Sequence, residues 1–257
     1  MQTALYVSLS AQVSLEKRLA TIANNMANVK TAAFRADAVK FDTAMSRAAA
    51  QSVAYATPGE NFISRKEGAV TQTGNPLDVA IAGNSMAAYP GGPDPGATTW
   101  MAFEGPNGPV YTRDGRMQMD INGQLRTLTG YPVLDSGGTP IMIDPDGGPI
   151  VIARDGSISQ GINQVGQLGL FDIAADAKLE RFGNSGVIPS KPATAALDFV
   201  TVGFQQGFVE GSNVDPLSEL THMMMATKTF QNVSSLIQDS ESSVQNAIRT
   251  LGDPAKG

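Results

Sequence analysis

The amino-acid sequence predicts an α+β fold, with N- and C-terminal helices that pair as a coiled coil and a long β-rich insert between them. Glycine and proline are absent from residues 1–57 and 217–251, whereas residues 58–216 hold 25 glycines and 14 prolines. Both ends carry apolar residues at seven-residue spacing, and the middle alternates polar and apolar residues between turn dipeptides. Since Gly and Pro mark turns and strand ends, these observations separate a turn-rich middle from two helical ends.

This layout predicts a division of the chain into three parts. Paired terminal helices are expected over residues 1–50 plus 217–257, because no breaker interrupts either end. An extended or β connecting region is expected over 51–84 plus 185–216. A β-rich outer domain is expected over 85–184, where turn signals are most frequent.

The first helix is predicted from two interleaved apolar rows. Leu15, Ile22 and Val29 recur every seven residues, and Leu19 and Met26 fall on the row between them. This spacing is typical of a narrow seam along which one helix packs against another.

Three asparagines, Asn24, Asn25 and Asn28, stand close together in this segment. Asparagine is a poor residue for a helix interior, because its amide competes with the backbone for hydrogen bonds. Two interpretations remain open. The asparagines mark the end of the helix, or they hydrogen-bond a neighbouring subunit and fix the register of an assembly, as a polar residue does in a coiled-coil core.

The last helix is predicted from an unbroken apolar row at seven-residue spacing, made by Met223, Phe230, Ile237, Val244 and Leu251. Before it, Asp215 can cap the helix and Pro216 fits the first helical turn. The alternative is an amphipathic helix packed on its own domain. So narrow a seam leaves most of the helix polar, which favours helices that project and pair.

The middle of the chain is predicted to consist of short strands and hairpins. Asp114-Gly115 and Asn122-Gly123 are hairpin dipeptides, and further turns are expected at Asp146-Gly147-Gly148 and Asp155-Gly156. The stretch from Tyr89 to Trp100 is rich in Pro and Gly, and we expect a surface loop there.

Composition excludes several classes of protein. The net charge of −6 argues against general nucleic-acid binding. Cysteine is absent, which removes disulfides, thiolate metal sites and thiol nucleophiles. No apolar run approaches the roughly 20 residues of a membrane span, and no basic segment precedes an apolar stretch at the N-terminus as in a cleavable signal.

The two ends of the chain carry opposite charge. Residues 1–50 hold six Lys or Arg and three acids, so their net charge is +3. Residues 207–257 hold three Lys or Arg and six acids, so their net charge is −3. The difference reflects either chance on two solvated faces or an attraction between the two ends.

Residues that could carry catalysis or bind a cofactor are scarce. His222 is the only histidine and no HExxH, GxxxxGK[ST], GxGxxG or GxSxG motif is present, so we predict no catalytic, metal-binding or cofactor-binding residues and no small-molecule substrate. A hydrolase would need convergent acids such as Asp114, Asp120 and Asp155, yet each adjoins turn residues. A module that binds a sugar or a peptide would need an exposed aromatic platform, and the middle has one tryptophan, Trp100, and few clustered aromatics.

Four separated stretches resemble one known family. "LATIANNMANVKTAAFRA" resembles the N-terminal signature of the flagellar basal-body rod and hook proteins, which usually has Thr-Gly-Phe where this chain has Ala32-Ala33-Phe34. The stretches "GNPLDVAIAGNS", "YTRDGRMQMDINGQLRTLTGYPVL" and "VEGSNVDPLSELTHMMMATKTFQ" are similar to other common segments of that family. Within it, "SVAYATPGENFISRKEGAVTQTGNPLDVAI" and "RFGNSGVIPS" look more like the proximal-rod type than the distal-rod type.

The resemblance implies a structural subunit that polymerises through its terminal helices into the periplasmic drive shaft carrying torque to the hook; a distal-rod or hook-type subunit is the alternative. It implies as partners copies of the chain, other rod proteins and the flagellar type III export apparatus, with export that needs no cleaved signal peptide. The residues expected at subunit interfaces are Leu15, Leu19, Ile22, Asn24, Asn25, Met26, Asn28, Val29, Phe34, Asn213, Met223, Phe230, Ile237, Val244 and Leu251.

Overall fold

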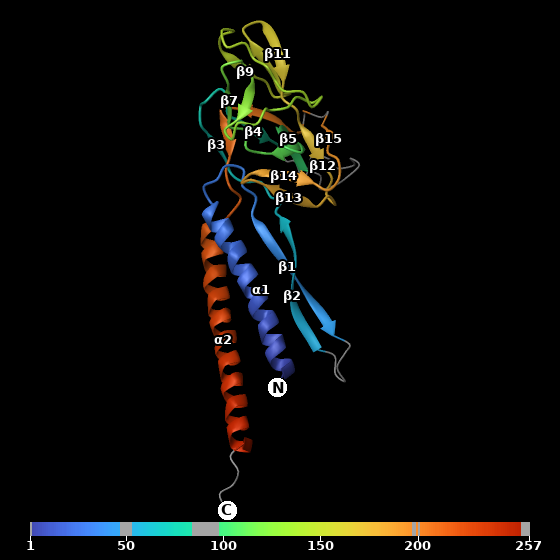
Figure 1. Ribbon diagram of the computed structural model, residues 1–257. Coiled ribbons are helices and arrows are strands. Elements are labelled where there is room, and N and C mark those ends of the chain that lie inside the picture. Colours follow the sequence, from blue (N-terminus) through green and yellow to red (C-terminus); the bar gives the residue numbers. More distant parts are fainter. Residues whose placement is uncertain (1, 47–52, 84–97, 197–198, 200, 253–257) are drawn as a thin grey trace, which may run out of the picture. The chain divides into compact units, whose positions relative to one another are not determined.

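The computed structural model describes residues 2–46, 53–83, 98–196, 199 and 201–252 and has an α+β fold (Figure 1). The chain divides into two compact units. The helical unit comprises residues 1–27, 37–62 and 215–257, and the β unit comprises residues 28–36 and 63–214. In chain order, the elements are α1 (Gln2–Ala27), β1 (Asp37–Ser46), β2 (Val53–Ile63), β3 (Val70–Gln72), β4 (Val79–Ala82), β5 (Thr98–Gly105), β6 (Gly108–Thr112), β7 (Met117–Met119), β8 (Leu125–Thr127), β9 (Ile150–Ile152), β10 (Ser157–Gln160), β11 (Asn163–Gln167), β12 (Phe171–Ile173), β13 (Leu179–Phe182), β14 (Gly186–Pro189), β15 (Thr194–Ala195), β16 (Gly203–Gln206), β17 (Phe208–Glu210) and α2 (Pro216–Gly252).

The helical unit contains α1, α2 and the paired strands β1 and β2. The helix α1 packs against α2 on one side and contacts β1. The two helices run antiparallel, because the N-terminal end of α1 and the C-terminal end of α2 point the same way (Figure 1). Among the described residues, neither helix has an apolar stretch long enough to cross a membrane.

The start of α2 agrees with its sequence prediction. The helix begins at Pro216, and the Asp215 carboxylate accepts a hydrogen bond from the Leu217 amide at 3.1 Å. This bond satisfies one of the four backbone donors that a helix leaves open at its N-terminus.

The N-terminal helix is shorter than the sequence predicts. Helical structure was expected throughout residues 1–50, but α1 ends at Ala27 and residues 37–46 form the strand β1. The segment from Asp37 to Ser46 places Val39, Phe41 and Met45 at even spacing, which is the period of a strand. Absence of Gly and Pro therefore permits a strand as readily as a helix.

The β unit is built from antiparallel sheets. The largest has six strands in the order β13-β14-β6-β5-β12-β15, and a three-stranded sheet has the order β11-β10-β9. Three two-stranded sheets pair β16 with β4, β17 with β3 and β7 with β8. Since β17 lies immediately before α2 in the chain, its pairing with β3 fixes the end of the insert to the body of the β unit.

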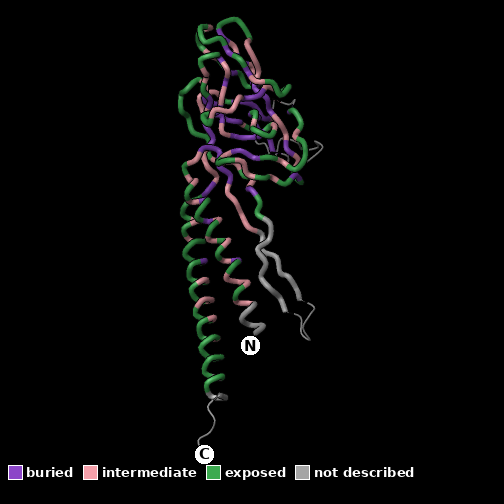
Figure 2. The backbone as a smooth tube through the Cα atoms, in the orientation of Figure 1, coloured by how far each residue is buried: buried purple, intermediate pink, exposed green. Residues whose placement is uncertain are grey.

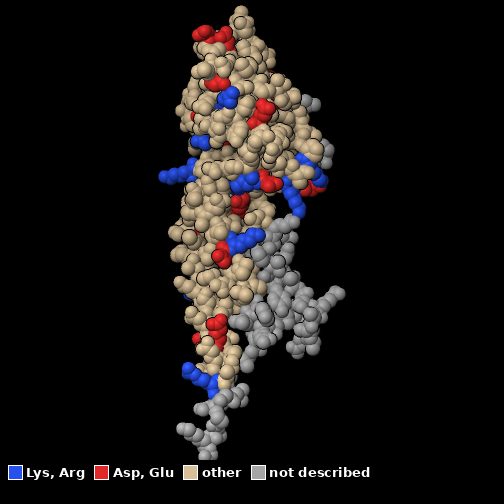
Figure 3. Space-filling model, in the orientation of Figure 1, with Lys and Arg blue, Asp and Glu red and all other residues tan. Residues whose placement is uncertain are grey.

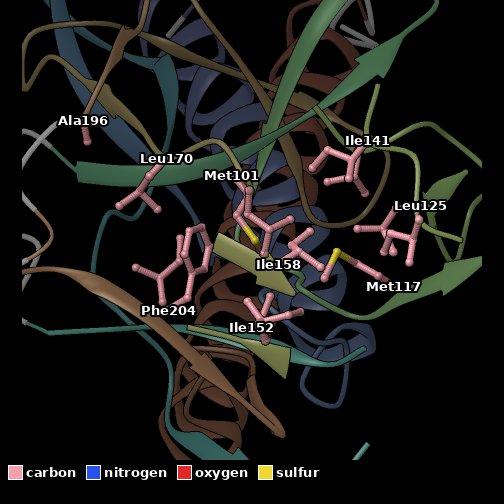
Figure 4. Close-up of a cluster of buried hydrophobic side chains, with 14 of the residues drawn as sticks. Met101, Met117, Leu125, Ile141, Ile152, Ile158, Leu170, Ala196 and Phe204 are labelled. Carbon is pink, nitrogen blue, oxygen red and sulfur yellow. The ribbon is translucent and has the colours of Figure 1, made fainter. Parts of the chain in front are cut away.

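Two hydrophobic clusters fill the β unit, and β5 contributes to both. Met101 belongs to a large cluster with Leu125, Ile158 and Phe204 (Figure 4). Trp100, its neighbour in the strand, belongs to a second cluster. Because successive side chains of a strand point to opposite faces, β5 is covered on both sides.

The turn predictions are confirmed at three positions, and the hairpin predicted at Asp114-Gly115 is wrong. Asn122-Gly123 joins the paired strands β7 and β8, and Asp155-Gly156 joins β9 and β10; both glycines have φ near +80°, which glycine adopts without strain. Asp114-Gly115 joins no hairpin, because β6 pairs with β5 and β14 whereas β7 pairs with β8. A turn is present at Asp146-Gly147-Gly148, where the Gly147 amide donates to the Asp144 carbonyl at 3.1 Å, and it lies between strands of different sheets.

The predicted surface loop from Tyr89 to Trp100 is wrong at its end. The strand β5 begins at Thr98, and Trp100 is fully buried in it. Residues 84–97 lie outside the described part of the chain. The run rich in Pro and Gly ends at Gly96, and Thr98, Thr99 and Trp100 after it belong to a strand.

Acid is expected to weaken the β unit through the turn at Asp120. Hydrogen bonds from the Gln124 amide (2.9 Å) and Arg126 Nε (2.8 Å) hold the pKa of the Asp120 carboxyl below its usual value. A carboxyl with a lowered pKa in the folded state stabilises the fold above about pH 4 and loses that contribution as pH falls through the folded pKa. Asp120→Asn should therefore flatten the acid limb of stability against pH, measured by urea unfolding through Trp100 fluorescence.

The matched control for this experiment is Glu104→Gln, which removes an exposed carboxylate of the same unit. It should leave the acid limb unchanged. An acid limb that is equally steep in Asp120→Asn and in the unaltered protein would contradict the prediction.

Candidate assembly surfaces

The predicted seam of α2 is its less exposed side. Phe230 and Ile237 are half-buried, and Ala226, which lies on the interleaved row, is 3% exposed. Met223 and Val244 are 36% and 37% exposed. The side chain of Leu251 lies outside the described residues. The seam is thus best covered along the middle of the helix, where α1 packs against it.

The predicted rows of α1 show the same pattern. Ile22 is 5% exposed, and Leu15, Leu19 and Met26 are half-buried. Val29 lies beyond the end of α1 and belongs to the β unit. The apolar row therefore ends with the helix, one heptad earlier than the spacing suggests.

The two helices differ in length. The helix α2 has 37 residues and α1 has 26, so at 1.5 Å per residue α2 is longer by about 16 Å. Asn25, near the end of α1, contacts Glu219, near the start of α2, so the extra length lies at the C-terminal end of α2. Residues 241–246, 248 and 249 are all exposed there. The helix α1 therefore leaves the last turns of the α2 seam uncovered.

A second apolar stripe on α2 was missed by the sequence interpretation. Leu217, Leu220 and Met224 are 72%, 47% and 59% exposed, and Figure 2 shows α2 largely exposed along its length. Their spacing of three and four residues places them on one face, away from the Phe230 and Ile237 face. On α1, Leu9 and Val13 are also about half exposed and share a face. The spacing signal was present in the sequence, but the longer heptad row masked it.

Asn24 and Asn25 connect α1 to the strand that follows. Asn25 is 2% exposed; its Oδ1 accepts from the Asp37 amide at 2.9 Å and its Nδ2 donates to the Asp37 carbonyl at 2.9 Å. Asn24 is exposed and donates to the Asp37 carboxylate at 3.0 Å. These contacts lie within one chain, at the last turn of α1, and account for asparagine at a helix end.

Asn25→Ala is expected to lower the free energy of unfolding of the helical unit by about 1–3 kcal/mol, because the half-buried backbone groups of Asp37 lose their partner at a buried position. Asn24→Ala, which removes an exposed bond, should cost less than about 1 kcal/mol. Urea unfolding followed by helical circular dichroism measures both. Equal losses for the two variants would contradict the assigned role of Asn25.

The only histidine lies beside the Asn25 contact. His222 is exposed and, with Asn25, Asp37 and Glu219, lines a hollow of about 320 Å³ in the helical unit. In the described residues, no group of three or more His, Cys, Asp or Glu side chains is arranged to hold a metal ion. The hollow therefore offers no assembled metal site in the described residues.

Asn28, Phe34 and Asn213 lie in the β unit. Asn28 Oδ1 accepts from the Thr31 hydroxyl at 3.0 Å. The Phe34 ring is 1% exposed. Asn213 Oδ1 accepts from the Ala36 amide at 2.7 Å, and its Nδ2 donates to the Lys66 carbonyl at 2.7 Å. Asn213 and Phe34 thus tie the segment after α1 to the segment before α2, and a role at a subunit interface stays a prediction.

A buried ion cluster strengthens this tie. Glu210 bridges two arginines, with 2.6 Å to Arg35 Nη2 and 2.6 Å to Arg113 Nε, and all three side chains are at most 2% exposed. Burial lowers the pKa of Arg35 to about 10, against the opposing attraction of Glu210. The Arg35 guanidinium also lies 5.6 Å from the Trp100 ring centroid. Arg35 and Glu210, one from each of the two oppositely charged terminal segments, thus form an ion pair within the β unit.

Ala33 takes the place of the glycine that the family signature usually has. Its φ is +52°, in the left-handed region, and its amide donates to the Glu210 carbonyl at 2.9 Å. An L-residue other than glycine holds this conformation at a cost of about 1–2 kcal/mol. The buried surroundings of Ala33, which is itself 0% exposed, hold it in this conformation.

The three aspartates of the hydrolase alternative are occupied in their own turns. Asp114 makes a bidentate pair with Arg116 at 2.7 and 2.8 Å. Asp120 accepts from the backbone of its turn, and Asp155 accepts from the Ser157 hydroxyl at 2.7 Å.

On the face in Figure 3, acidic and basic side chains are scattered over the described surface, with no extended basic patch.

Comparison with known proteins identifies the family. Residues 205–250 match the model of the flagellar basal body rod FlgEFG protein C-terminal region, and residues 98–160 match the flagellar hook protein FlgE/F/G D1 domain. The chain is 42% identical to the flagellar basal-body rod protein FlgF of Mesorhizobium japonicum and to that of Rhizobium meliloti, each over 98% of this chain and 99% of the relative. It is 30% identical to the flagellar basal-body rod protein FlgG of Bacillus subtilis, over 96% of this chain and 98% of the relative. With near-complete coverage at this identity, the chain belongs to the flagellar basal-body rod protein family.

Proposed function

We propose that this chain is a structural subunit of the bacterial flagellar basal-body rod, of the FlgF type, and that it polymerises through its helical unit. In this proposal α1 and α2 pair as a coiled coil and neighbouring subunits cover the rest of their apolar surface. The assembled rod crosses the periplasm and transmits torque to the hook. The observation that carries the proposal is the apolar surface of α2 that α1 leaves open.

Two parts of that surface need a partner. The stripe of Leu217, Leu220 and Met224 faces away from the α1 contact. The end of the seam, with Val244, extends past α1. Burying such side chains contributes about 1.5–3 kcal/mol each, so a subunit that stacks on both parts gains stability that the single chain lacks.

The partners follow from the same role. Copies of this chain and other rod proteins would occupy the open surfaces, and the flagellar type III apparatus would export the chain without cleaving a signal peptide. We infer no catalysis. This inference is supported by the structural role of the relatives and by the engagement of Asp114, Asp120 and Asp155 within their own turns.

Deletion of the encoding gene in its own bacterium tests the proposal. The deletion strain should be non-motile, and a tagged copy should restore motility and be recovered in purified basal bodies. Electron microscopy of those basal bodies should place the tag on the rod. Normal swimming in the deletion strain, or a tagged protein that is functional but absent from basal bodies, would refute the assignment.

A truncation at the end of α2 separates the role of the helical unit from that of the β unit. Removing residues 241–257 deletes the part of α2 that extends beyond α1, and should prevent incorporation into basal bodies. Because the deleted residues belong to the helical unit, the β unit should still unfold cooperatively when followed by Trp100 fluorescence. Incorporation at normal levels would show that the end of the α2 seam has no neighbour.

A further inference from the structure

The β unit contains a hollow that its proposed structural role does not use. Its volume is about 460 Å³, within the range of about 300–1,000 Å³ that small-molecule sites occupy. Residues of β5, β6, β8, β13 and β14 line it, together with the turn at 183–186. The hollow is therefore formed by strand residues together with the turns that join them.

Three aromatic rings gather at this hollow. Phe103 and Tyr131 stack with ring centroids 5.4 Å apart, and Phe182 meets Tyr131 at 5.8 Å in an edge-on arrangement. Phe103 is buried, whereas Tyr131 and Phe182 are half-buried. The sequence led us to expect few clustered aromatics in the middle of the chain. These three rings do cluster, because residues that are distant in sequence meet in the fold.

Polar groups with unused hydrogen-bonding capacity line the same hollow. Among the described residues, the Tyr131 hydroxyl, the Asn184 side-chain amide and Arg116 Nη1 make no hydrogen bond with the protein. A phenol, an amide and a guanidinium nitrogen provide both donors and acceptors. The hollow thus combines apolar ring surface with available polar groups, as sites for small polar ligands do.

The charges at the hollow are already neutralised. Asp114 and Arg116 are the charged residues that line it, and they bind each other in a bidentate pair. Because the pair is neutral as a whole, the hollow offers an ionic ligand no uncompensated charge. The ligand that fits is therefore uncharged.

Most of the sheet strands at this hollow offer a peptide no pairing edge. The lining strands β5, β6 and β14 each have a hydrogen-bonded neighbour on both sides in the six-stranded sheet, and only β13 lies at an edge of that sheet. A peptide that binds by adding a strand needs a free edge. A sugar needs none, because pyranose rings present C–H faces to aromatic rings and hydroxyls to polar groups.

We propose that the hollow between β13, β14 and the Tyr131 segment binds a neutral oligosaccharide. A pyranose ring stacks on the part-exposed faces of Tyr131 and Phe182, and its hydroxyls bond to Asn184 and Arg116. This role is independent of polymerisation through the helical unit. The structural subunit would thereby also contact glycan.

Titration of the purified full-length chain with chitotriose, cellotriose and maltotriose tests the proposal. Calorimetry and two-dimensional amide NMR should detect saturable binding of at least one sugar, with Kd near about 1 mM. The amide shifts should fall on residues 182–186 and around Tyr131. The three sugars distinguish acetylated from plain β-linked chains and β- from α-linked chains. No binding of any of them would overturn the proposal.

A matched pair of variants locates the site. Asn184 and Asn163 are both exposed asparagines of hairpins in the β unit, but only Asn184 lines the hollow. Asn184→Ala should weaken binding about tenfold, because the sugar loses its hydrogen bonds to the Asn184 amide. Asn163→Ala should leave the affinity unchanged. Tyr131→Ala should also weaken it, whereas Tyr131→Phe should retain most of the affinity because the ring remains.

Two outcomes would contradict the binding of a sugar in this hollow. If sugar binding is the same in Asn184→Ala and the unaltered chain, the glycan lies at another place and the proposal fails. If Asn184→Ala abolishes incorporation into basal bodies and no sugar binds, the hollow receives a neighbouring protein. Since sugar binding is measured on the free chain, failure here leaves the rod assignment untouched.

Discussion

Replacing Glu210 by glutamine is expected to lower the free energy of unfolding of the β unit by about 3–5 kcal/mol. Glu210 is 1% exposed and its two carboxylate oxygens each bind a buried arginine at 2.6 Å. It also accepts from the Gly68 amide at 3.0 Å. The glutamine variant leaves two buried guanidinium groups without their shared counter-charge, which is costly because the interior solvates charge poorly.

Trp100 fluorescence reports this loss directly. Trp100 is the only tryptophan, is fully buried in the β unit and lies beside Arg35. Urea unfolding followed through Trp100 should give a much lower midpoint for Glu210→Gln than for the unaltered chain. Glu67→Gln is the matched control, because Glu67 contacts Arg113 at 3.1 Å but is 31% exposed. Its loss should be about 1 kcal/mol or less.

The comparison also distinguishes the source of the effect. If burial of charge is the cause, Glu210→Gln should cost several times more than Glu67→Gln. Similar losses for both variants would show that the cluster contributes no more than exposed pairs do. The buried bridge would then not be what holds the segments around Arg35 and Glu210 together.

Sequence pattern predicted the elements whose signal is local. The long breaker-free end and its heptad row predicted α2, and Asp215 with Pro216 predicted where it begins. Asn122-Gly123 predicted a hairpin because a two-residue turn is decided by its own residues. The predicted N-terminal helix is too long, because no residue in 37–46 prevents a helix. These residues form a strand because β1 pairs with β2.

The features that sequence did not predict depend on distant contacts. Asp114-Gly115 has the chemistry of a hairpin turn, yet β6 finds its partners in β5 and β14. Arg35 and Glu210 are far apart in sequence, and their charges alone could not distinguish a buried bridge from two solvated groups. Phe103, Tyr131 and Phe182 are also far apart in sequence, and the sequence alone does not indicate that their rings meet. Spacing indicates which face of an element is apolar, but the partner that covers it is determined by the tertiary fold.

Several residues predicted at subunit interfaces make contacts within the chain instead, whereas some exposed apolar residues were not predicted. Phe34 and Asn213 make internal contacts of the β unit, and Asn25 makes internal contacts of the helical unit. Leu217, Leu220 and Met224 were not predicted, and they expose more apolar surface than most of the predicted seam does. We therefore expect the neighbouring subunit to engage this outer stripe of α2.

The double variant Leu217→Glu with Met224→Glu is expected to abolish motility while the chain stays folded. Both side chains are exposed, and a glutamate in the first helical turn is favoured by the helix dipole. At a subunit contact, the variant loses two apolar side chains worth about 3–6 kcal/mol together and buries unpaired charge. Since about 1.4 kcal/mol is a factor of ten in association, assembly should fall more than about a hundredfold.

Met225→Glu is the matched control, because Met225 is 62% exposed but lies about 100° further round the helix than Met224. It introduces the same charge at an equally exposed methionine and should leave swimming largely intact. Soft-agar motility and the amount of the chain in purified basal bodies measure the outcome, with circular dichroism confirming the fold. If the double variant swims normally, the stripe faces solvent in the rod; if Met225→Glu blocks assembly equally, the contact is broader than this stripe.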